Sequence, residues 1–425
     1  MRIAVIGSGI SGMVAAHRLS ADHEVTVFES GASVGGHTHT VDVDHAGQHY
    51  AVDTGFIVYN DWTYPRFIEI LRELDVAWQP SQMSFSVRCE KSGLEYNGTR
   101  LNTLFAQRRN LIRPAFLRMI ADILRFNRRA PALLQSAADR SSLGDYLERE
   151  RYSRYFVDHY IIPMGAAIWS SRPVDMLEFP ARFFVEFFMN HGFLSVNDRP
   201  TWRVIRGGSR EYVKKLTARY ATGIRLQTPV ASIQRRRNRV ILRLRSGALE
   251  HFDQVFVACH SDQALRLLSD ATPEEREILG AFPYQANEAL LHTDARLMPR
   301  RELAWAAWNY HLPIEAYDRV TVTYNMNILQ SLDAPAQFLL TLNRSEQVDP
   351  SKVIGRYLYD HPVYTSAAVA AQKRRLEING TRRTYYCGAY WGYGFHEDGV
   401  KSALASVDDF LRQETREQPH LQRVG

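Results

Sequence analysis

The sequence predicts an α/β fold in which a parallel nucleotide-binding sheet is combined with a second domain of mixed α and β structure. Three observations predict this fold. A strand, a glycine-rich turn and a helix form residues 2–19, a short buried strand lies at 254–258, and a strand followed by an amphipathic helix lies at 384–411. Of the 425 residues, 45% are hydrophobic and 23% are charged, which is typical of globular proteins and excludes a disordered chain.

The glycine-rich turn has the spacing of a dinucleotide-binding site. Gly7, Gly9 and Gly12 follow the apolar strand 2–6 in the pattern G-x-G-x-x-G. The first glycine makes the tight turn, the second lets a pyrophosphate approach the backbone, and the third lets the helix pack on the strand. The N–H groups at the start of the helix, including that of Ser11, then face the phosphates.

A second strand, 24–28, ends at Glu29. An acid at this point accepts hydrogen bonds from the adenosine ribose, which disfavours the 2′-phosphate of NADP. The order of strand, glycines, helix, strand and acid therefore predicts a Rossmann-like site, with NAD and FAD both open at this stage.

Two further segments favour FAD. Gly35-Gly36-His37-Thr38 supply a second glycine pair, and Asp53-Thr54-Gly55-Phe56 form a later loop. Both resemble the FAD enzymes of the amine oxidase, protoporphyrinogen oxidase and phytoene desaturase superfamily. In that superfamily an arginine usually follows the glycine pair, and the later loop returns under the isoalloxazine ring. Here His37 takes the place of the arginine.

The C-terminal region fits the same resemblance. The strand 384–388 ends in glycine, and Gly394-Phe395-His396-Glu397-Asp398-Gly399 precede a helix with an apolar stripe. We expect Asp398 to cap this helix. In the superfamily, the N-terminus of such a helix points at the flavin pyrimidine edge, where its dipole favours the negative charge of the reduced flavin. Cys387 is expected to be a buried strand residue rather than a covalent attachment point.

In the middle of the chain, 202–209 resembles the superfamily's G-G-x-x-x-L element, and Val230 falls at its adenine-contacting position. Residues 224–249 alternate like a β-meander, with the run Arg235–Arg239 expected at a solvated hairpin tip. The residues predicted to hold FAD non-covalently are Gly7, Gly9, Ser11, Gly12, Glu29, Gly35, Gly36, His37, Thr38, Asp53, Thr54, Gly55, Phe56, Val230, Gly388, His396, Glu397, Asp398 and Gly399.

Together these segments predict an amine-oxidase-like α/β protein, with a Rossmann-like (GR2-type) FAD-binding domain and an interleaved α+β substrate domain. The FAD-binding domain is discontinuous and comprises 1–60, 201–265 and 376–425. The substrate domain comprises 61–200 and 266–375. The three cysteines lie far apart and form no cluster, so we expect no metal site.

The net charge of +6 arises from one segment. Residues 108–129 hold seven arginines against one acid, Asp122, so the rest of the chain sums to zero. We expect a helix over 111–126 with arginines on one side and apolar side chains on the other. The apolar side chains are Phe116, Leu117, Ile120, Ile123 and Leu124. Such a helix suits an anionic lipid surface, and a solvated helix packed on its own core is the alternative.

No apolar run approaches the ~20 residues needed to span a bilayer, and nothing indicates a nucleic-acid partner. We therefore expect a cytoplasmic protein that associates peripherally with the inner face of the membrane. Aromatic residues are dense at 179–193 and 305–310. In the non-nucleotide domain of such a fold, they favour a large apolar pocket.

A closer resemblance covers the chain essentially end to end. Several strings look like the bacterial flavoproteins related to the N-terminal oxidase-like domain of plant cyclopropane fatty acid synthases. These strings are 163–170, 190–194, 198–202, 292–294 and 304–310. The resemblance implies an FAD-dependent oxidoreductase that works beside a cyclopropane-synthase-like lipid methyltransferase and desaturates a methyl-branched, phospholipid-bound fatty acid.

Desaturation by a flavin needs a hydride acceptor and a base for the second proton. His191, His292 and Asp294 lie in the matching strings and are the candidate bases. Two other functions stay open. One is an amine or polyamine oxidase, which the arginine surplus disfavours because its substrate is cationic. The other is a non-catalytic flavin-bound subunit that docks the methyltransferase on lipid.

Overall fold

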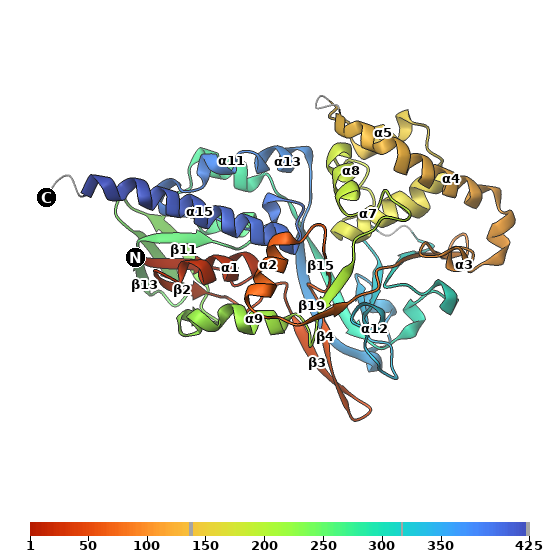
Figure 1. Ribbon diagram of the computed structural model, residues 1–425, viewed down its shortest axis with the longest axis horizontal. Coiled ribbons are helices and arrows are strands. Elements are labelled where there is room, and N and C mark those ends of the chain that lie inside the picture. Colours follow the sequence, from red (N-terminus) through yellow and green to blue (C-terminus); the bar gives the residue numbers. More distant parts are fainter. Residues whose placement is uncertain (136–138, 316–317, 422–425) are drawn as a thin grey trace.

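The computed structural model describes residues 1–135, 139–315 and 318–421 and has the predicted α/β architecture (Figure 1). Its nucleotide-binding sheet has five strands in the order β10-β2-β1-β14-β20, and all neighbours are parallel. The strands are β1 (Arg2–Ile6), β2 (Glu24–Phe28), β10 (Ile224–Arg225), β14 (Gln254–Val257) and β20 (Thr384–Tyr386). They come from all three segments assigned to the FAD-binding domain, whose boundaries stay a prediction.

Both faces of this sheet are covered, as apolar parallel strands require. Ile3 and Val5 pack with helices α1 (Ile10–Leu19) and α15 (His396–Leu421) on one face. Ala4 and Ile6 point the other way, toward an antiparallel meander. The covering elements on that face are β11 (Val230–Arg235), β12 (Val240–Leu244), β13 (Leu249–Phe252), α10 (Ser261–Leu267), α11 (Pro273–Gly280), α13 (Ser366–Gln372) and α14 (Arg375–Ile378).

The second part of the molecule is built on a seven-stranded sheet in the order β19-β15-β18-β17-β16-β7-β8. Its strands are β7 (Phe85–Cys89), β8 (Leu94–Asn97), β15 (Tyr284–His292), β16 (Trp308–Leu312), β17 (Val322–Asn325), β18 (Leu339–Leu342) and β19 (Val353–Pro362). Two small sheets join the parts, the hairpin β3 (Thr40–His45) with β4 (Gln48–Asp53), and β5 (Tyr59–Asn60), β9 (Trp202–Ile205) and β6 (Trp78–Pro80).

The helices of the second part lie mainly at the end of the molecule far from both termini (Figure 1). They are α3 (Leu101–Leu104), α4 (Pro114–Arg129), α5 (Leu143–Arg149), α6 (Arg154–Phe156), α7 (Ile162–Trp169) and α8 (Ala181–Asn190). Helices α2 (Pro65–Glu73), α9 (Arg210–Thr217) and α12 (Met326–Leu329) lie elsewhere. Within the described residues, no helix combines the length and apolar character of a membrane span.

Helix α4 differs from the expected helix in its outward face. Phe116 is buried as predicted, but Leu117 and Leu124 are 43% and 46% exposed. Asp122 is buried instead, where its carboxylate pairs with Arg118 and Arg125 and accepts the Ser153 N–H. The helix therefore packs through Phe116, Met119, Asp122 and Phe126, and two of the leucines assigned to its core face contact solvent.

The buried side chain of Asp53 connects three segments of the chain by hydrogen bonds. Its buried carboxylate accepts hydrogen bonds from the backbone N–H and hydroxyl of Ser209, from Thr40 Oγ1 at 2.6 Å and from Gln330 Nε2 at 3.1 Å. Burial raises the pKa of Asp53 to about 6, and the hydrogen bonds from Thr40 and Ser209 oppose that rise. Asp53 thus joins the strand β4 to the start of α9 and to the end of α12.

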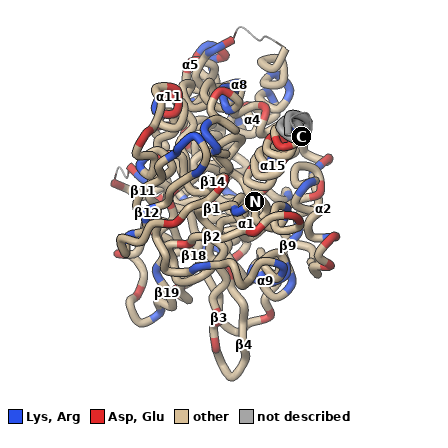
Figure 2. Tube along the Cα trace, turned by 90° about the vertical axis from the view of Figure 1, so that its left-hand side faces the viewer, with Lys and Arg blue, Asp and Glu red and all other residues tan. Residues whose placement is uncertain are grey.

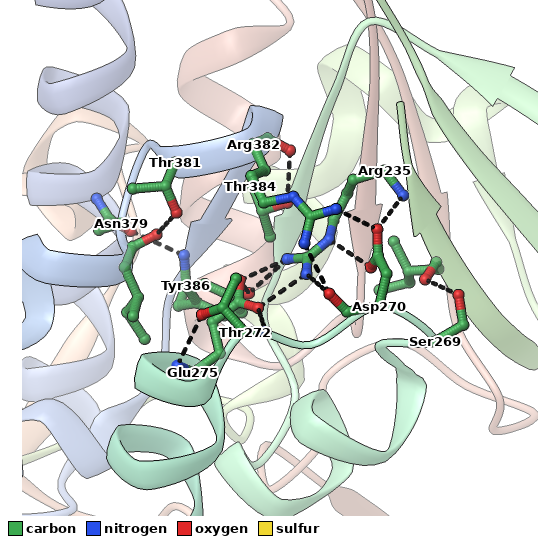
Figure 3. A network of polar contacts seen from close by, with 12 residues as sticks. Arg235, Ser269, Asp270, Thr272, Glu275, Asn379, Thr381, Arg382, Thr384 and Tyr386 are labelled. Atoms are coloured by element: carbon green, nitrogen blue, oxygen red, sulfur yellow. Dashed lines mark hydrogen bonds and ion pairs between the residues drawn. The ribbon is translucent and has the colours of Figure 1, made fainter. Parts of the chain in front are cut away.

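A second buried network corrects the expectation for one residue of the run Arg235–Arg239, because Arg235 is buried whereas residues 236–239 are exposed at the β11–β12 turn as expected (Figure 3). The Arg235 side chain is fully buried and donates to both Glu275 oxygens, at 2.5 and 2.8 Å. It also donates to Asp270 Oδ1 at 2.8 Å, and Tyr386 donates to Glu275 Oε1 at 2.6 Å. Burial alone would raise the pKa of Glu275, but the hydrogen bonds from Arg235 and Tyr386 lower it. The network links β11, α11 and β20.

We expect Arg235→Met to destabilise the protein by about 3–5 kcal/mol, because it leaves the buried Glu275 carboxylate without its ion-pair partner. The exposed neighbour Arg237 is the matched control. Arg237→Met should change the free energy of unfolding by less than about 0.5 kcal/mol. Denaturant unfolding of the two variants would measure this, and equal stabilities would contradict the structural role of the network.

Candidate functional site

One cavity of about 1160 Å³ runs from the carboxyl ends of β1, β2 and β14 into the second part of the molecule. This place is expected, because ligands of open α/β sheets bind outside the carboxyl ends of the strands. Its volume exceeds the ~300–1,000 Å³ of ordinary small-molecule sites. The cavity can therefore hold a dinucleotide and part of a second molecule.

The start of α1 provides an anion-binding cradle. Gly7 has a φ of +97°, and a Cβ there would lie 2.9 Å from the Ala258 carbonyl oxygen. A Cβ on Gly12 would overlap the Gly7 carbonyl, so the helix packs directly on the turn. At Gly9, by contrast, a Cβ would meet nothing within 4 Å. No side chain caps α1. Its N-terminal N–H groups and the open space at Gly9 fit the diphosphate of FAD.

Glu29 lies at the end of β2 and lines the same cavity. Its Oε2 accepts the Ser8 N–H at 2.9 Å and the Ser8 hydroxyl at 2.6 Å, and its Oε1 accepts the Gly31 N–H at 2.7 Å. A carboxylate has about four acceptor positions. A ribose hydroxyl therefore fits best at Oε1, where the Ser30 hydroxyl donates only weakly at 3.3 Å.

His37 belongs to a cluster of three histidines that line the cavity. The His37 ring lies 5.8 Å from the ring of His260 and 5.5 Å from that of His361. Burial, with His361 and His260 adding to the effect, lowers the pKa of His37 to about 3. Burial also lowers the pKa of His361 to about 4 and that of His260. All three rings are therefore neutral at pH 7.

The C-terminal motif reaches the cavity through Gly388 and His396. The His396 ring stacks on Phe56, with centroids 3.6 Å apart, and its Nε2 lies 2.7 Å from the Tyr212 hydroxyl. Burial lowers the pKa of His396, so this ring is neutral as well. Thr38 packs behind it, with Oγ1 2.5 Å from the Tyr212 hydroxyl.

Most of the residues expected to hold FAD line the cavity. They are Gly7, Gly9, Ser11, Glu29, Gly35, Gly36, His37, Thr54, Gly55, Phe56, Val230, Gly388 and His396. Six others are outside the lining and have other contacts. They are Gly12, Thr38, Asp53, Glu397, Asp398 and Gly399.

Three of these outlying residues position the start of α15. Glu397 accepts the N–H groups of Arg66 and Phe67 and so caps α2. Asp398 does not cap its own helix, because it accepts the N–H groups of Tyr393 and Phe395 before the helix starts. A Cβ on Gly399 would meet Ile10 at 2.7 Å, so this glycine lets α15 approach α1.

The other half of the cavity, called here the aromatic half, lies in the second part of the molecule. It is lined by Met83, Phe85, Tyr96, Tyr160, Met164, Ile168, Trp169, Phe187, His191, Phe193, Trp308, Tyr324, Leu340 and Leu342. Among the described lining residues, Glu29 and Asp360 supply the carboxylates. Both are on the nucleotide side, since Asp360 interacts with His37 and His260.

Of the three candidate bases, only His191 reaches the cavity. Its Nδ1 donates to the Phe187 carbonyl at 3.0 Å, and its ring stacks on Phe187 at 3.8 Å. This hydrogen bond leaves the lone pair on Nε2. Burial lowers the pKa of His191 to about 4, so the ring is neutral and can accept a proton.

The structure does not place the other two candidate bases in the cavity. His292 is fully buried at the end of β15, where its Nε2 lies 2.7 Å from Thr341 Oγ1 and its Nδ1 accepts the Asp294 N–H. Asp294 is buried against Arg296, whose guanidinium lowers its pKa. Both side chains stabilise the turn after β15, because they are committed to protein partners and face away from any substrate.

Sequence reasoning missed His260, His361 and Tyr359, which also line the cavity. A signal existed for His260, since it follows the buried strand β14 at its carboxyl end, where ligands bind. His361 and Tyr359 come from β19 of the second part, and no local pattern connects that strand to the nucleotide site.

We expect Gly9→Val to abolish FAD binding while the apoprotein stays folded, because the valine side chain enters open space that the diphosphate needs. Gly12→Val is the contrasting variant and should unfold the apoprotein, since its side chain overlaps the Gly7 backbone. Flavin absorbance after reconstitution and the unfolding midpoint of the apoprotein measure the two effects. Undiminished flavin binding by the Gly9 variant would contradict this placement of the diphosphate.

Acid should destabilise the apoprotein between about pH 6.5 and pH 3. The lowered pKa values of His37, His260 and His361 mean that the unfolded chain binds more protons in this window, so stability is present above it and lost as the pH falls. Asp262 and Asp360 also face the cluster and raise the pKa of His260, which reduces the effect. Arg266 lowers the pKa of His260 and adds to it. His37→Gln should flatten the dependence of the unfolding midpoint on pH, whereas His251→Gln, at an exposed ring, should not.

Solved structures of the same fold cover nearly the whole chain. A CLA-producing fatty acid isomerase from P. acnes is 16% identical, with a TM-score of 0.69 over 97% of this chain and 98% of that one. Cyclohexylamine oxidase from Brevibacterium oxydans is 15% identical, with a TM-score of 0.68 over 96% and 99%. Putrescine oxidase is 13% identical, with a TM-score of 0.70 over 97% and 99%.

The sequence matches no curated protein. The family model for flavin containing amine oxidoreductases matches residues 10–305, which is well over half of the chain. The chain therefore belongs to the flavin containing amine oxidoreductase family and is an FAD-dependent oxidoreductase with an amine-oxidase-like fold.

Proposed function

We propose that this FAD-dependent oxidoreductase desaturates a lipid acyl chain, and that the chain is a methyl-branched fatty acid carried on a phospholipid. FAD, when bound, supplies a hydride acceptor. The protein would then work beside a cyclopropane-synthase-like methyltransferase, since methylation must precede desaturation. A fatty acid isomerase among the solved structures of this fold is consistent with an acyl substrate.

The observation that carries the proposal is the composition of the aromatic half. Its described lining is aromatic and aliphatic apart from His191, a few hydroxyl groups and Arg199 at its mouth. An acyl chain binds by burial of its methylenes, each contributing about 0.8 kcal/mol. Such a wall suits a long hydrocarbon and offers a cationic amine no carboxylate to pair with.

His191 is the residue best placed to take the proton. It lies in the aromatic half, and its Nδ1–H bond to the Phe187 carbonyl holds the ring with Nε2 free to accept. Stacking on Phe187 fixes the plane of the imidazole. Burial lowers the pKa of His191 and so keeps the ring neutral, with the Nε2 lone pair available as the proton acceptor.

Two other functions compete with this proposal. A polyamine oxidase shares the fold, as putrescine oxidase shows, but its cationic substrate is not matched by the lining of the aromatic half. A non-catalytic flavin-bound subunit of the methyltransferase is the other competitor. A purely structural subunit would have no need for a cavity of this size, and this argues against the second competitor.

The deciding experiment is anaerobic reduction of the bound flavin. We expect a methylated phospholipid to bleach the flavin and to lose two mass units, and unmethylated phospholipids to react more slowly. Bleaching by polyamines alone would establish amine oxidation instead. No bleaching by any lipid or amine would favour the non-catalytic subunit.

We expect His191→Gln to slow flavin reduction by about 10²–10⁴-fold, the range for loss of a general base. Asp294→Asn is the matched control, because Asp294 is an equal candidate by sequence but lies outside the cavity lining. It should lower the stability of the protein and leave the rate of the folded fraction unchanged. Rapid-mixing absorbance at several pH values measures both, and an unchanged rate in the His191 variant would exclude it as the base.

A further inference from the structure

We propose that an exposed basic and apolar surface beside the cavity docks the protein on an anionic lipid bilayer. We call it the tip surface. It consists of the exposed side chains of Leu101, Arg108, Arg109, Leu111, Ile112, Leu117, Leu124 and Arg128. The inference rests on the proposed lipid substrate for its purpose, but the binding can be tested without turnover.

The apolar part of the tip surface is unusually exposed. Leu101 is 77% exposed, Leu111 51% and Ile112 84%, and the two outward leucines of α4 lie next along the chain. Single exposed apolar residues need no explanation, but five within 24 consecutive positions mark an interaction surface. Figure 1 shows α3, α4 and the ribbon joining them at the end of the molecule opposite both termini.

The charges of the tip surface are all positive. No ion pair between described residues involves Arg108, Arg109 or Arg128, and the Arg108 and Arg109 guanidinium groups donate to amide or carbonyl oxygens. The one acid of the segment, Asp122, is buried and already paired. The opposite end of the molecule differs, because basic and acidic residues are interspersed there (Figure 2).

The tip surface adjoins the aromatic half of the cavity. Tyr96, Gly98 and Thr99 line the cavity, and the last two are also exposed, so they lie at its mouth. Leu101 follows them at the start of α3. Arg199 lies at the same mouth, since it lines the cavity, is exposed, and interacts with Tyr160, which in turn interacts with Tyr96.

This juxtaposition favours a bilayer as the partner. Arginines attract anionic headgroups, and apolar side chains between them enter the headgroup and acyl boundary. A substrate held in the bilayer would then reach the cavity without crossing water. A protein partner would cover the apolar side chains equally well. A surface made for a protein partner would not bind lipid vesicles, so vesicle binding separates the two.

The test uses the FAD-loaded protein and vesicles of pure phosphatidylcholine or of phosphatidylcholine with 30% phosphatidylglycerol. We expect binding to the anionic vesicles that weakens as salt rises, and little binding to the neutral ones. The combined variant Arg108→Gln, Arg109→Gln, Arg128→Gln should bind about 100-fold more weakly, since each arginine near an anionic surface contributes roughly fivefold.

A matched control removes the same charge elsewhere. Arg236, Arg237 and Arg239 are exposed at the β11–β12 turn on the other part of the molecule. Changing all three to Gln should leave vesicle binding within about twofold of the wild type. An equal loss in both triple variants would mean that net charge alone drives binding, and would overturn the tip surface.

A tryptophan reporter keeps the test independent of how the charge variants fold. Ile112→Trp places an indole at the most exposed apolar position of the tip surface, and Leu376→Trp does so at a 68% exposed position of α14. On anionic vesicles, the emission that Ile112→Trp adds to that of the seven native tryptophans, taken as the difference from the wild type, should shift to the blue and be quenched by brominated lipid. The emission of the indole introduced by Leu376→Trp should do neither. Absence of the shift in the Ile112→Trp variant would overturn the proposal.

Failure of this proposal and failure of the proposed function are distinguishable. If the chain desaturates a detergent-dispersed lipid but the wild type does not bind vesicles, the function stands and the docking surface falls. If vesicles bind through the tip surface but no lipid reduces the flavin, the surface stands and the function falls. When both stand, the charge variant should lose activity on vesicle-borne lipid by about the same factor as binding, and keep activity on dispersed lipid.

Discussion

The structure depends on a close approach of two backbones at the start of the chain. Helix α1 reaches its position only because Gly12 lies against the Gly7 carbonyl, and because the turn at Gly7 lies against Ala258 after β14. Any side chain at these points would push the helix away from the sheet. The direction of the α1 N-terminus, and with it the anion cradle, follows from this contact. The Gly399 contact on Ile10 then brings the second long helix, α15, to the same place.

Much of the nucleotide half could be predicted from sequence, because its signals are local. The glycines at 7, 9 and 12, the acid at the end of β2 and the strand before Gly388 each lie within one strand–turn–helix unit. The errors concern long-range partners. The arginines that follow Arg235 in the sequence predict a solvated side chain. The acids that pair with it, Asp270 and Glu275, lie 35 and 40 residues further along the chain.

The candidate bases show the same limit. His292 and Asp294 are candidates by residue type and by resemblance, and neither criterion states which way a side chain points. The register of β15 against β18 places the His292 side chain next to Thr341, so its hydrogen bond lies within the sheet. In α4, apolar residues occupy more than one face, so periodicity alone could not decide that Leu117 and Leu124 face out.

The replacement of arginine by His37 changes how the cofactor's negative charge is met. Burial and the neighbouring His260 and His361 keep this ring uncharged at neutral pH, so it offers a hydrogen bond and no formal charge. The α1 backbone N–H groups and their dipole, which carry about half an elementary charge at the helix N-terminus, would then face the diphosphate, and Arg245 and Arg266 also line the nucleotide side of the cavity. Fixed dipoles inside a cavity are screened far less by salt than exposed ion pairs are. The part of cofactor binding that the α1 cradle supplies should consequently depend on shape and on the glycine backbone more than on ionic strength, in contrast to the salt-sensitive contact at the tip surface.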